Sequence, residues 1–479
     1  MRRKISGITS AAAAALAIVA LLVGVGIGVA VGPMVAPPAA VTETVTKTVT
    51  QTAAGGTVTV TKTAAAETVT VTKTETVGGE RVTVTVTQTA AGGGLSGEIT
   101  LGALLPLSGS LASYGENSKA AIEIALQEIN SWLEKSGSPV RFTVLIEDTE
   151  TKPDVALTKL QSLAAKGIRL IIGPQTSAEV RNLKGFADSN KILMISQSST
   201  APELSIPDDF IYRFCPDDTK QGPAIARAMW EDGVRVVVPI WRGDAWGDGL
   251  HKASKEAFEK LGGQFLEGIR YAPEEVEKKG FGAEVGLLAD AVQAAVDEHG
   301  ADKVGVLFIA FAEAVDLLTK ANDYPILSQV RWYGSDGTAL LAEILQEPLA
   351  AEFAVKTKWL NPIFGEPNPK RTQLREQLVA KLGRLPDSYA YSAYDITWVL
   401  ALSVLAAQST DAEAVIKAMP GVLSFYTGAI GKIELNEGGD LAKSDYELWQ
   451  IKKVGDQYEW VQVGGWDFET DTVSYTMEH

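Results

Sequence analysis

The chain has 479 residues, more than one compact hydrophobic core usually supports, so at least two core-bearing domains are expected. Its formal net charge of −16 argues against a nucleic-acid binder, because phosphates require a basic surface. The single cysteine, Cys215, excludes an intramolecular disulfide and a cysteine-rich metal site. We therefore expect a protein that folds mostly in water and holds no metal or other cofactor.

The N-terminal residues are predicted to enter a membrane. The chain begins MRRK, carries no charge from Ile5 to Thr42, and is densely apolar from residue 11 to residue 31. About 20 apolar residues can cross a bilayer, and a usual secretory signal has a shorter apolar region. The basic start favours an N-terminus inside and the rest of the chain outside. We expect residues 1–32 to be a membrane anchor or signal segment, which would place the protein on the extracellular face of the cell membrane.

Residues 33–97 differ in composition from the rest of the chain. Thr and Val dominate from Val41 to Gly94, and the string QTAAGG begins at Gln51 and again at Gln88. The alternation taken alone is typical of β-strands, but without Leu, Ile or aromatic residues the segment can bury little surface. We interpret residues 33–97 as an extended stalk. Its threonines are either O-glycosylation sites or part of a plain spacer.

From Gly97 onward, buried strands alternate with amphipathic helices, which indicates mainly parallel sheets covered on both faces. A first series of strands is predicted at residues 99–107, 140–148, 168–174 and 192–196. A second series is predicted at residues 234–240, 303–310 and 330–336. Two such series predict an α/β fold with two doubly wound, Rossmann-like lobes. Ligands of such sheets bind beyond the carboxyl ends of the strands.

Polar residues follow the strands of the first series. Tyr114 stands at a helix entry after the first strand, and Thr176 or Ser177 begins a helix after the third, with Glu179 completing a capping box. This pattern either caps the helix only or lets Ser177 and the helix N-terminus receive a carboxylate. The polar run from Ser196 to Thr200 is either turn chemistry or a set of hydrogen-bonding groups that converges with Ser177.

The strands of the second series are followed by Trp246, Phe311 and Asp336. Each residue alone is explained by packing or by helix capping. Together they offer an apolar wall and a carboxylate opposite the hydroxyl groups of the first lobe. No histidine follows any of these strands and Ser177 has no visible base, so an enzyme is not expected.

Seven stretches in order resemble the branched-chain amino-acid-binding proteins of ABC transporters, a type I periplasmic-binding fold that includes amide and urea binders: LGALLPLSGSLASYG, IIGPQTSAEV, ILMISQSSTAPEL, IYRFCPDDTKQG, AWGDG, RWYGSDG and SAYDITWVLALSVL. The resemblance implies three crossings between lobes, near Asp217–Gln221, Leu360–Pro362 and Tyr426–Ala429. Lobe 1 would then comprise residues 98–218 plus 361–427, and lobe 2 residues 219–360 plus 428–479.

The resemblance also implies roles for individual residues. Ser177 resembles the hydroxyl ligand of an α-carboxylate, and Ser198 and Thr200 resemble a pair that contacts carboxylate and ammonium, Ser198 through its backbone. Asp336 resembles the acid that pairs with the ammonium, although leucine-binding members have a longer Glu there. Tyr114, Trp246 and Phe311 match positions around the ligand side chain, and Trp246 replaces a more usual Tyr.

These features predict an extracytoplasmic solute-binding protein of an ABC importer. It would capture a small amino-acid-like ligand by lobe closure and deliver it to a membrane permease. One alternative is a ligand-sensing ectodomain that signals through a partner. Another is a binder of an amide, urea or a small carboxylate.

Overall fold

The computed structural model describes residues 47–53, 56–63, 68–77, 80–89 and 95–479. The chain forms two compact units, Met1–Gly92 and Gly93–His479. The expected anchor or signal segment, residues 1–32, lies outside the described residues. In the first unit the described residues form an antiparallel sheet in the order β1-β2-β3-β4, with bounds Lys47–Ala53, Gly56–Thr63, Thr68–Val77 and Glu80–Thr89.

This sheet differs from the single extended stalk expected for residues 33–97. In β3 and β4 the register sets Thr70 opposite Thr87 and Val71 opposite Val86, so like residues face each other across the pair. Alternating β-branched residues favour strands, and neighbouring strands satisfy each other's backbone hydrogen bonds. The sparse burial expected of this composition therefore does not prevent strand pairing over these ranges.

Lobe 1 of the second unit is built on a parallel sheet in the order β6-β5-β7-β8-β9. Its strands are β5 (Gly97–Leu105), β6 (Val140–Asp148), β7 (Leu170–Ile172), β8 (Leu193–Ser196) and β9 (Ile211–Arg213). Its helices are α2 (Ala112–Lys135), α3 (Pro153–Ala165), α4 (Ser177–Ser189), η1 (Pro202–Leu204), α12 (Pro369–Leu382), α13 (Ser388–Ala407) and α14 (Ala412–Leu423). The predicted alternation of buried strands and helices is confirmed in this lobe.

Lobe 2 is built on a mixed sheet in the order β11-β10-β13-β14-β15-β18-β19-β20, with β12 beside β10. Its strands are β10 (Val236–Arg242), β11 (Gln264–Phe265), β12 (Ile269–Tyr271), β13 (Val304–Ile309), β14 (Arg331–Tyr333), β15 (Leu360–Phe364), β18 (Tyr446–Val454), β19 (Gln457–Asp467) and β20 (Thr472–Tyr475). Its helices are α5 (Asp218–Glu231), α6 (Ala245–Lys260), α7 (Pro273–Lys279), α8 (Gly282–His299), α9 (Ala314–Ala321), η2 (Pro325–Ser328), α10 (Ala342–Gln346) and α11 (Pro348–Lys356). The strands from β10 to β15 are parallel, whereas β18, β19 and β20 run antiparallel at one edge.

The second crossing between the lobes lies later in the chain than expected. The stretch Leu360–Pro362 belongs to β15, which pairs with β14 and β18 inside the sheet of lobe 2. The chain leaves lobe 2 only after Phe364 and enters α12, which packs against α2 in lobe 1. The predicted boundary at residue 361 is therefore wrong, because this proline-containing stretch is a paired strand.

The third crossing is also later than Tyr426–Ala429. The β16–β17 hairpin (Thr427–Gly428 and Gly431–Lys432) stays with lobe 1, because Asp395 of α13 accepts hydrogen bonds from the backbone of Ala429 and Ile430 at 2.9 and 2.8 Å. Further on, Leu441 donates its backbone N–H to Arg213 of β9. The crossing thus falls between Leu441 and the start of β18, and the predicted boundary at residue 428 is corrected accordingly.

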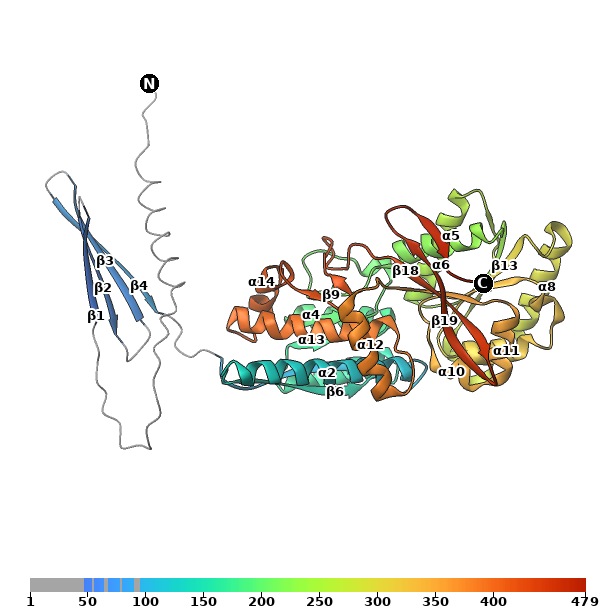
Figure 1. The fold of residues 1–479 in the computed structure, drawn as a ribbon, viewed down its shortest axis with the longest axis horizontal. Coiled ribbons are helices and arrows are strands. Elements are labelled where there is room, and N and C mark those ends of the chain that lie inside the picture. The colour runs from blue at the N-terminus through green and yellow to red at the C-terminus, as the bar shows by residue number, and fades with distance from the viewer. Residues whose placement is uncertain (1–46, 54–55, 64–67, 78–79, 90–94) are drawn as a thin grey trace, which may run out of the picture. The chain divides into compact units, whose positions relative to one another are not determined.

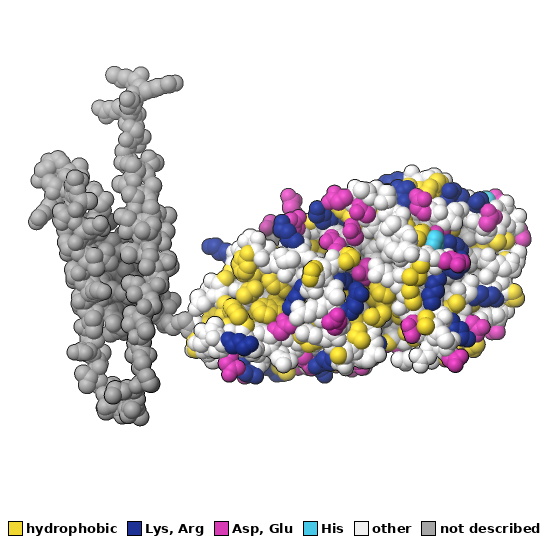
Figure 2. Space-filling model, viewed as in Figure 1, with side chains coloured by type: hydrophobic (Ala, Val, Ile, Leu, Met, Phe, Trp, Pro, Cys, Tyr) yellow, Lys and Arg dark blue, Asp and Glu magenta, His cyan; other side chains and the backbone are white. Residues whose placement is uncertain are grey.

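Helix α13 is long and apolar enough to cross a membrane, but it is buried inside this unit. It lies between α2 and α14, so a late segment of the chain completes a lobe whose sheet is made early (Figure 1). Trp398 of α13 contacts Trp132 of α2, with ring centroids 6.2 Å apart. Apolar side chains gather over this part of the surface, whereas charged ones of both signs are scattered elsewhere on the visible face (Figure 2).

Candidate functional site

A cavity between the two lobes brings together six of the seven residues selected from the sequence, and only Thr200 is missing from its lining. It is lined by Leu111, Tyr114, Gln175, Thr176, Ser177, Ser198, Trp246, Phe311, Asp336, Gly337 and Tyr389. The cavity has a volume of about 20 Å³, close to the space of one water molecule. A larger ligand therefore enters only when the lobes move apart.

The start of α4 forms part of the lobe 1 wall. Thr176 is its N-cap and completes the predicted capping box, since the Glu179 backbone N–H donates to Thr176 Oγ1 and the Glu179 carboxylate accepts from the Thr176 backbone. Burial raises the pKa of Glu179. Because Thr176 does the capping, Ser177 is left for other contacts.

Ser177 Oγ accepts two hydrogen bonds, from the backbone N–H of Ala201 at 3.1 Å and from Ser199 Oγ at 3.2 Å. A hydroxyl carries one proton of its own, which these two bonds leave free to donate. The helix N-terminus adds a partial positive charge at the same place. This corner of the cavity therefore suits an anionic or carbonyl oxygen.

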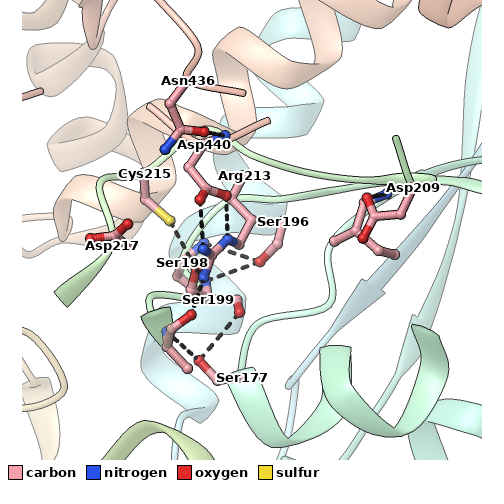
Figure 3. Close-up of polar contacts among 12 residues, drawn as sticks. Ser177, Ser196, Ser198, Ser199, Asp209, Arg213, Cys215, Asp217, Asn436 and Asp440 are labelled. Carbon is pink, nitrogen blue, oxygen red and sulfur yellow. Dashed lines mark hydrogen bonds and ion pairs between the residues drawn. The ribbon is translucent and has the colours of Figure 1, made fainter. Parts of the chain in front are cut away.

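Arg213, which is fully buried at the end of β9, holds the polar run after β8 in place. Its guanidinium donates to the carbonyl oxygens of Ser199 and Ala201 at 2.9 and 2.8 Å and pairs with Asp440 through two hydrogen bonds of 2.5 and 2.7 Å (Figure 3). The Cys215 thiol donates to the same Ser199 carbonyl. The thiol of this single cysteine is thus buried against the loop.

Within this run, Ser198 and Thr200 are used in different ways. Ser198 lines the cavity, but its hydroxyl donates to the Gln175 carbonyl at 2.5 Å. Thr200 is buried outside the cavity lining, and its carbonyl accepts the backbone N–H of Asp218 at 2.9 Å. Thr200 therefore joins the lobe 1 loop to the first helix of lobe 2.

Asp336 follows β14 and supplies the carboxylate of the lobe 2 wall. Its backbone N–H donates to Gln221 Oε1 at 3.0 Å, Gly337 donates to its Oδ1, and the Tyr389 hydroxyl donates to its Oδ2. Burial raises the pKa of Asp336 to about 6. The pKa of the nearby Asp218 is also raised, first by burial and then by the charge of Asp336. The site thus holds buried acidic groups that a cation would stabilise.

Tyr114 crosses between the lobes. Its hydroxyl lies 2.8 Å from the Asp336 carbonyl and 2.5 Å from the Ala339 carbonyl, both in lobe 2. The next residue must be small, because a Cβ on Gly115 would come within 2.1 Å of the Pro106 carbonyl oxygen. Close packing of α2 against the preceding loop therefore positions Tyr114 so that its hydroxyl can bond to lobe 2.

Two stacked aromatic rings form the apolar part of the lobe 2 wall. The Trp246 and Phe311 ring centroids lie 4.7 Å apart with the rings nearly parallel, and the Arg242 guanidinium lies over the Phe311 ring, 3.8 Å from its centroid. Arg242 in turn pairs with Asp244 and Glu313, each at 2.6 Å. The aromatic wall is therefore held in place by an ion-pair cluster behind it.

Besides the N-cap Thr176, the cavity lining contains two polar residues that were not singled out in the sequence, Tyr389 and Gln175. Tyr389 stands two residues after Asp387, the N-cap of α13, and reaches the site from the helix that returns to lobe 1. Gln175 lies in the loop after β7, so inspection of every residue beyond each strand would have found it. Among the residues that the structure describes, no group of His, Cys, Asp and Glu side chains is arranged to hold a metal.

Two α/β lobes joined by three crossings, with hydroxyls on one wall of an interlobe cavity and a carboxylate on the other, define a bilobed solute-binding protein. The chain belongs to the periplasmic binding protein family, whose pattern it matches over residues 98–456. The predicted membership of the branched-chain amino-acid-binding, type I branch is confirmed by its relatives. This family consists of extracytoplasmic solute-binding proteins.

Three similar proteins illustrate this membership. The chain is 34% identical over 398 residues to an uncharacterized protein of Methanocaldococcus jannaschii, covering 79% of this chain and 91% of that protein. It is 26% identical to the Leu/Ile/Val-binding protein BraC3 of Rhizobium johnstonii, covering 74% and 93%. The crystal structure of the leucine binding protein LivK from Thermotoga maritima has the same fold, with a TM-score of 0.62, 20% identity and coverage of 76% and 97%.

Proposed function

We propose that this protein captures a small zwitterionic amino acid between its lobes and delivers it to an ABC permease in the membrane. The observation that carries this proposal is the placement of the Ser177 hydroxyl and the Asp336 carboxylate on opposite lobes of one cavity. An α-carboxylate would meet Ser177 and the start of α4, and an α-ammonium would meet Asp336. Both charges are satisfied only when the lobes close, so binding shifts the protein toward the closed form.

The same contacts support binding rather than catalysis. The partners of Ser177 Oγ are the Ser199 hydroxyl and the Ala201 backbone N–H, and neither is a base that could activate a nucleophile. The ligand would therefore be released unchanged. We further propose that residues 1–32 hold the protein at the outer face of the membrane, as the sequence predicts.

A thermal-shift screen of the full chain against amino acids, amides, urea and small carboxylates tests the proposal. A ligand at 100 times its Kd stabilises the protein by about 2.7 kcal/mol, which a shift in Tm detects. We expect amino acids to stabilise the protein and Ser177→Ala to weaken the effect. Stabilisation by carboxylates without an ammonium, with no response to any amino acid, would contradict the proposed ligand class.

A further inference from the structure

Gln175 is a buried amide in the wall of the cavity. It lies between β7 and the N-cap of α4, is 2% exposed, and lines the cavity on the same side as Ser177 and Ser198. Among the described residues, its side-chain oxygen is bonded to Gln197 and its carbonyl to Ser198. Gln175 therefore brings a neutral hydrogen-bonding group to the cavity.

One end of this amide is paired within the protein. Gln197 Nε2 donates to Gln175 Oε1 at 2.6 Å, and the Gln175 backbone carbonyl accepts from Ser198 Oγ. The acceptor end of the side chain is thus occupied. Its Nε2 has no hydrogen-bond partner among the described residues, although it is fully buried. Buried donors are nearly always paired in folded proteins, so an unpaired one that lines a cavity indicates a ligand contact.

Gln197 Oε1 is unpaired as well, and turning both amides over would pair it with Gln175 Nε2 but leave Gln175 Oε1 free instead, so one end of the Gln175 amide is unpaired in either orientation. Leu111, Trp246 and Phe311 present carbon to the cavity, and the Asp336 carboxylate already accepts from Tyr389 and Gly337. A leucine, isoleucine or valine side chain in this space would also leave the free end of the Gln175 amide unpaired. A ligand side chain with an amide or hydroxyl group would pair the free end of the amide in either orientation.

We propose that Gln175 determines specificity by selecting amino acids whose side chain carries a hydrogen-bonding group over the branched aliphatic ones. This inference rests on the proposed function, since it assumes an amino-acid ligand in the same cavity. A site built to hydrogen-bond a ligand group discriminates strongly against analogues that lack the group. For one neutral hydrogen bond we expect a preference of about tenfold to a hundredfold.

Isosteric ligand pairs separate this effect from ligand size. Asparagine and leucine have side chains of nearly the same shape, as do threonine and valine, and only the first of each pair carries an acceptor. Calorimetry on the full chain gives Kd for all four. We expect the wild type to prefer asparagine to leucine, and threonine to valine, by at least about tenfold.

The substitution Gln175→Met keeps the length of the side chain and removes its N–H groups. We expect it to abolish the preference within each pair, mainly by weakening the polar ligand. The matched control is Gln293→Met, the same change at an exposed position on α8, which should leave both the preference and Tm unchanged. Tm of the Gln175→Met protein checks that the variant is folded.

The outcomes separate this inference from the proposed function. If the wild type binds leucine as tightly as asparagine, the role of Gln175 is overturned while amino-acid capture stands. If Gln175→Met weakens both members of each pair equally, the amide contacts the shared α-carboxylate, and the specificity role is likewise overturned. If no amino acid binds at all, the proposed function fails and this inference fails with it.

Discussion

At the scale of single residues, Asp336 carries the strongest expectation. Asp336→Ala would leave the ligand ammonium without a counter-charge in the closed cleft. Breaking a buried ion pair typically costs about 3 to 5 kcal/mol, so we expect Kd to rise by about 10² to 10³·⁵. Calorimetry with the best ligand of the thermal-shift screen measures the change. Unchanged affinity would show that the ammonium does not meet this carboxylate.

The raised pKa of Asp336 predicts a pH dependence of binding. Burial raises this pKa from 3.8 to about 6, so the carboxylate binds a proton as the pH falls from 7 to 5. Because the ammonium needs the ionised form, we expect affinity to fall about tenfold over that range. For the unliganded protein the sign is opposite: the stability that the protonated acid contributes is fully present below pH 3.8 and is lost as the pH rises through 6. Calorimetry at several pH values tests the effect on binding, and Asp336→Asn should flatten the profile.

Only the site residues that directly follow a parallel strand could be predicted from the sequence. Residues just beyond parallel strands meet at one sheet edge, and this rule leads to Ser177, Ser198 and Asp336. It cannot lead to Tyr389, which comes from the start of a helix far along the chain. The Gln175 amide pairs with Gln197, and no sequence pattern reveals that contact.

At the scale of elements, the buried pair of Arg213 and Asp440 links β9 to the segment before β18. Arg213→Ala would leave Asp440 buried without its partner, and we expect a loss of about 3 to 5 kcal/mol in the free energy of unfolding. Urea denaturation followed by circular dichroism measures it. The exposed pair Lys191–Glu413 serves as the control, and Lys191→Ala should cost less than about 1 kcal/mol. Equal losses in the two variants would contradict the structural role of Arg213.

Sequence patterns predicted the strands and helices of both lobes better than the points where the chain changes lobe. The resemblance implies a crossing at Leu360–Pro362, but this stretch belongs to the paired strand β15. The segment around Asp440 has no long strand of its own, and its place in lobe 1 depends on contacts with Arg213. In the Thr- and Val-rich segment, the alternation of the sequence is typical of strands, and the described residues there form strands.

At the scale of the whole binding unit, Tyr114 contributes to lobe closure. Tyr114→Phe removes the hydroxyl that bonds to lobe 2, and the loss of one or two neutral hydrogen bonds should shift the balance toward the open form by about 1 to 2 kcal/mol. Small-angle X-ray scattering would show a larger radius of gyration without ligand and a smaller one with it. Tyr333→Phe, which removes a hydroxyl bonded to Asp232 within lobe 2, is the matched control. Identical scattering from the two variants would argue against a role for Tyr114 in closure.

The contact between Arg213 and Asp440 also bears on how the protein is made. The two residues are 227 positions apart, and ribosomes build the chain from its N-terminus. The strands of lobe 1 are therefore synthesised long before the residues that neutralise the arginine at their end. A nascent chain that stops short of Asp440 lacks the counter-ion of Arg213. A chain that stops before Ser388 also lacks α13. Lobe 1 therefore gains this ion pair only after the chain has been synthesised through Asp440.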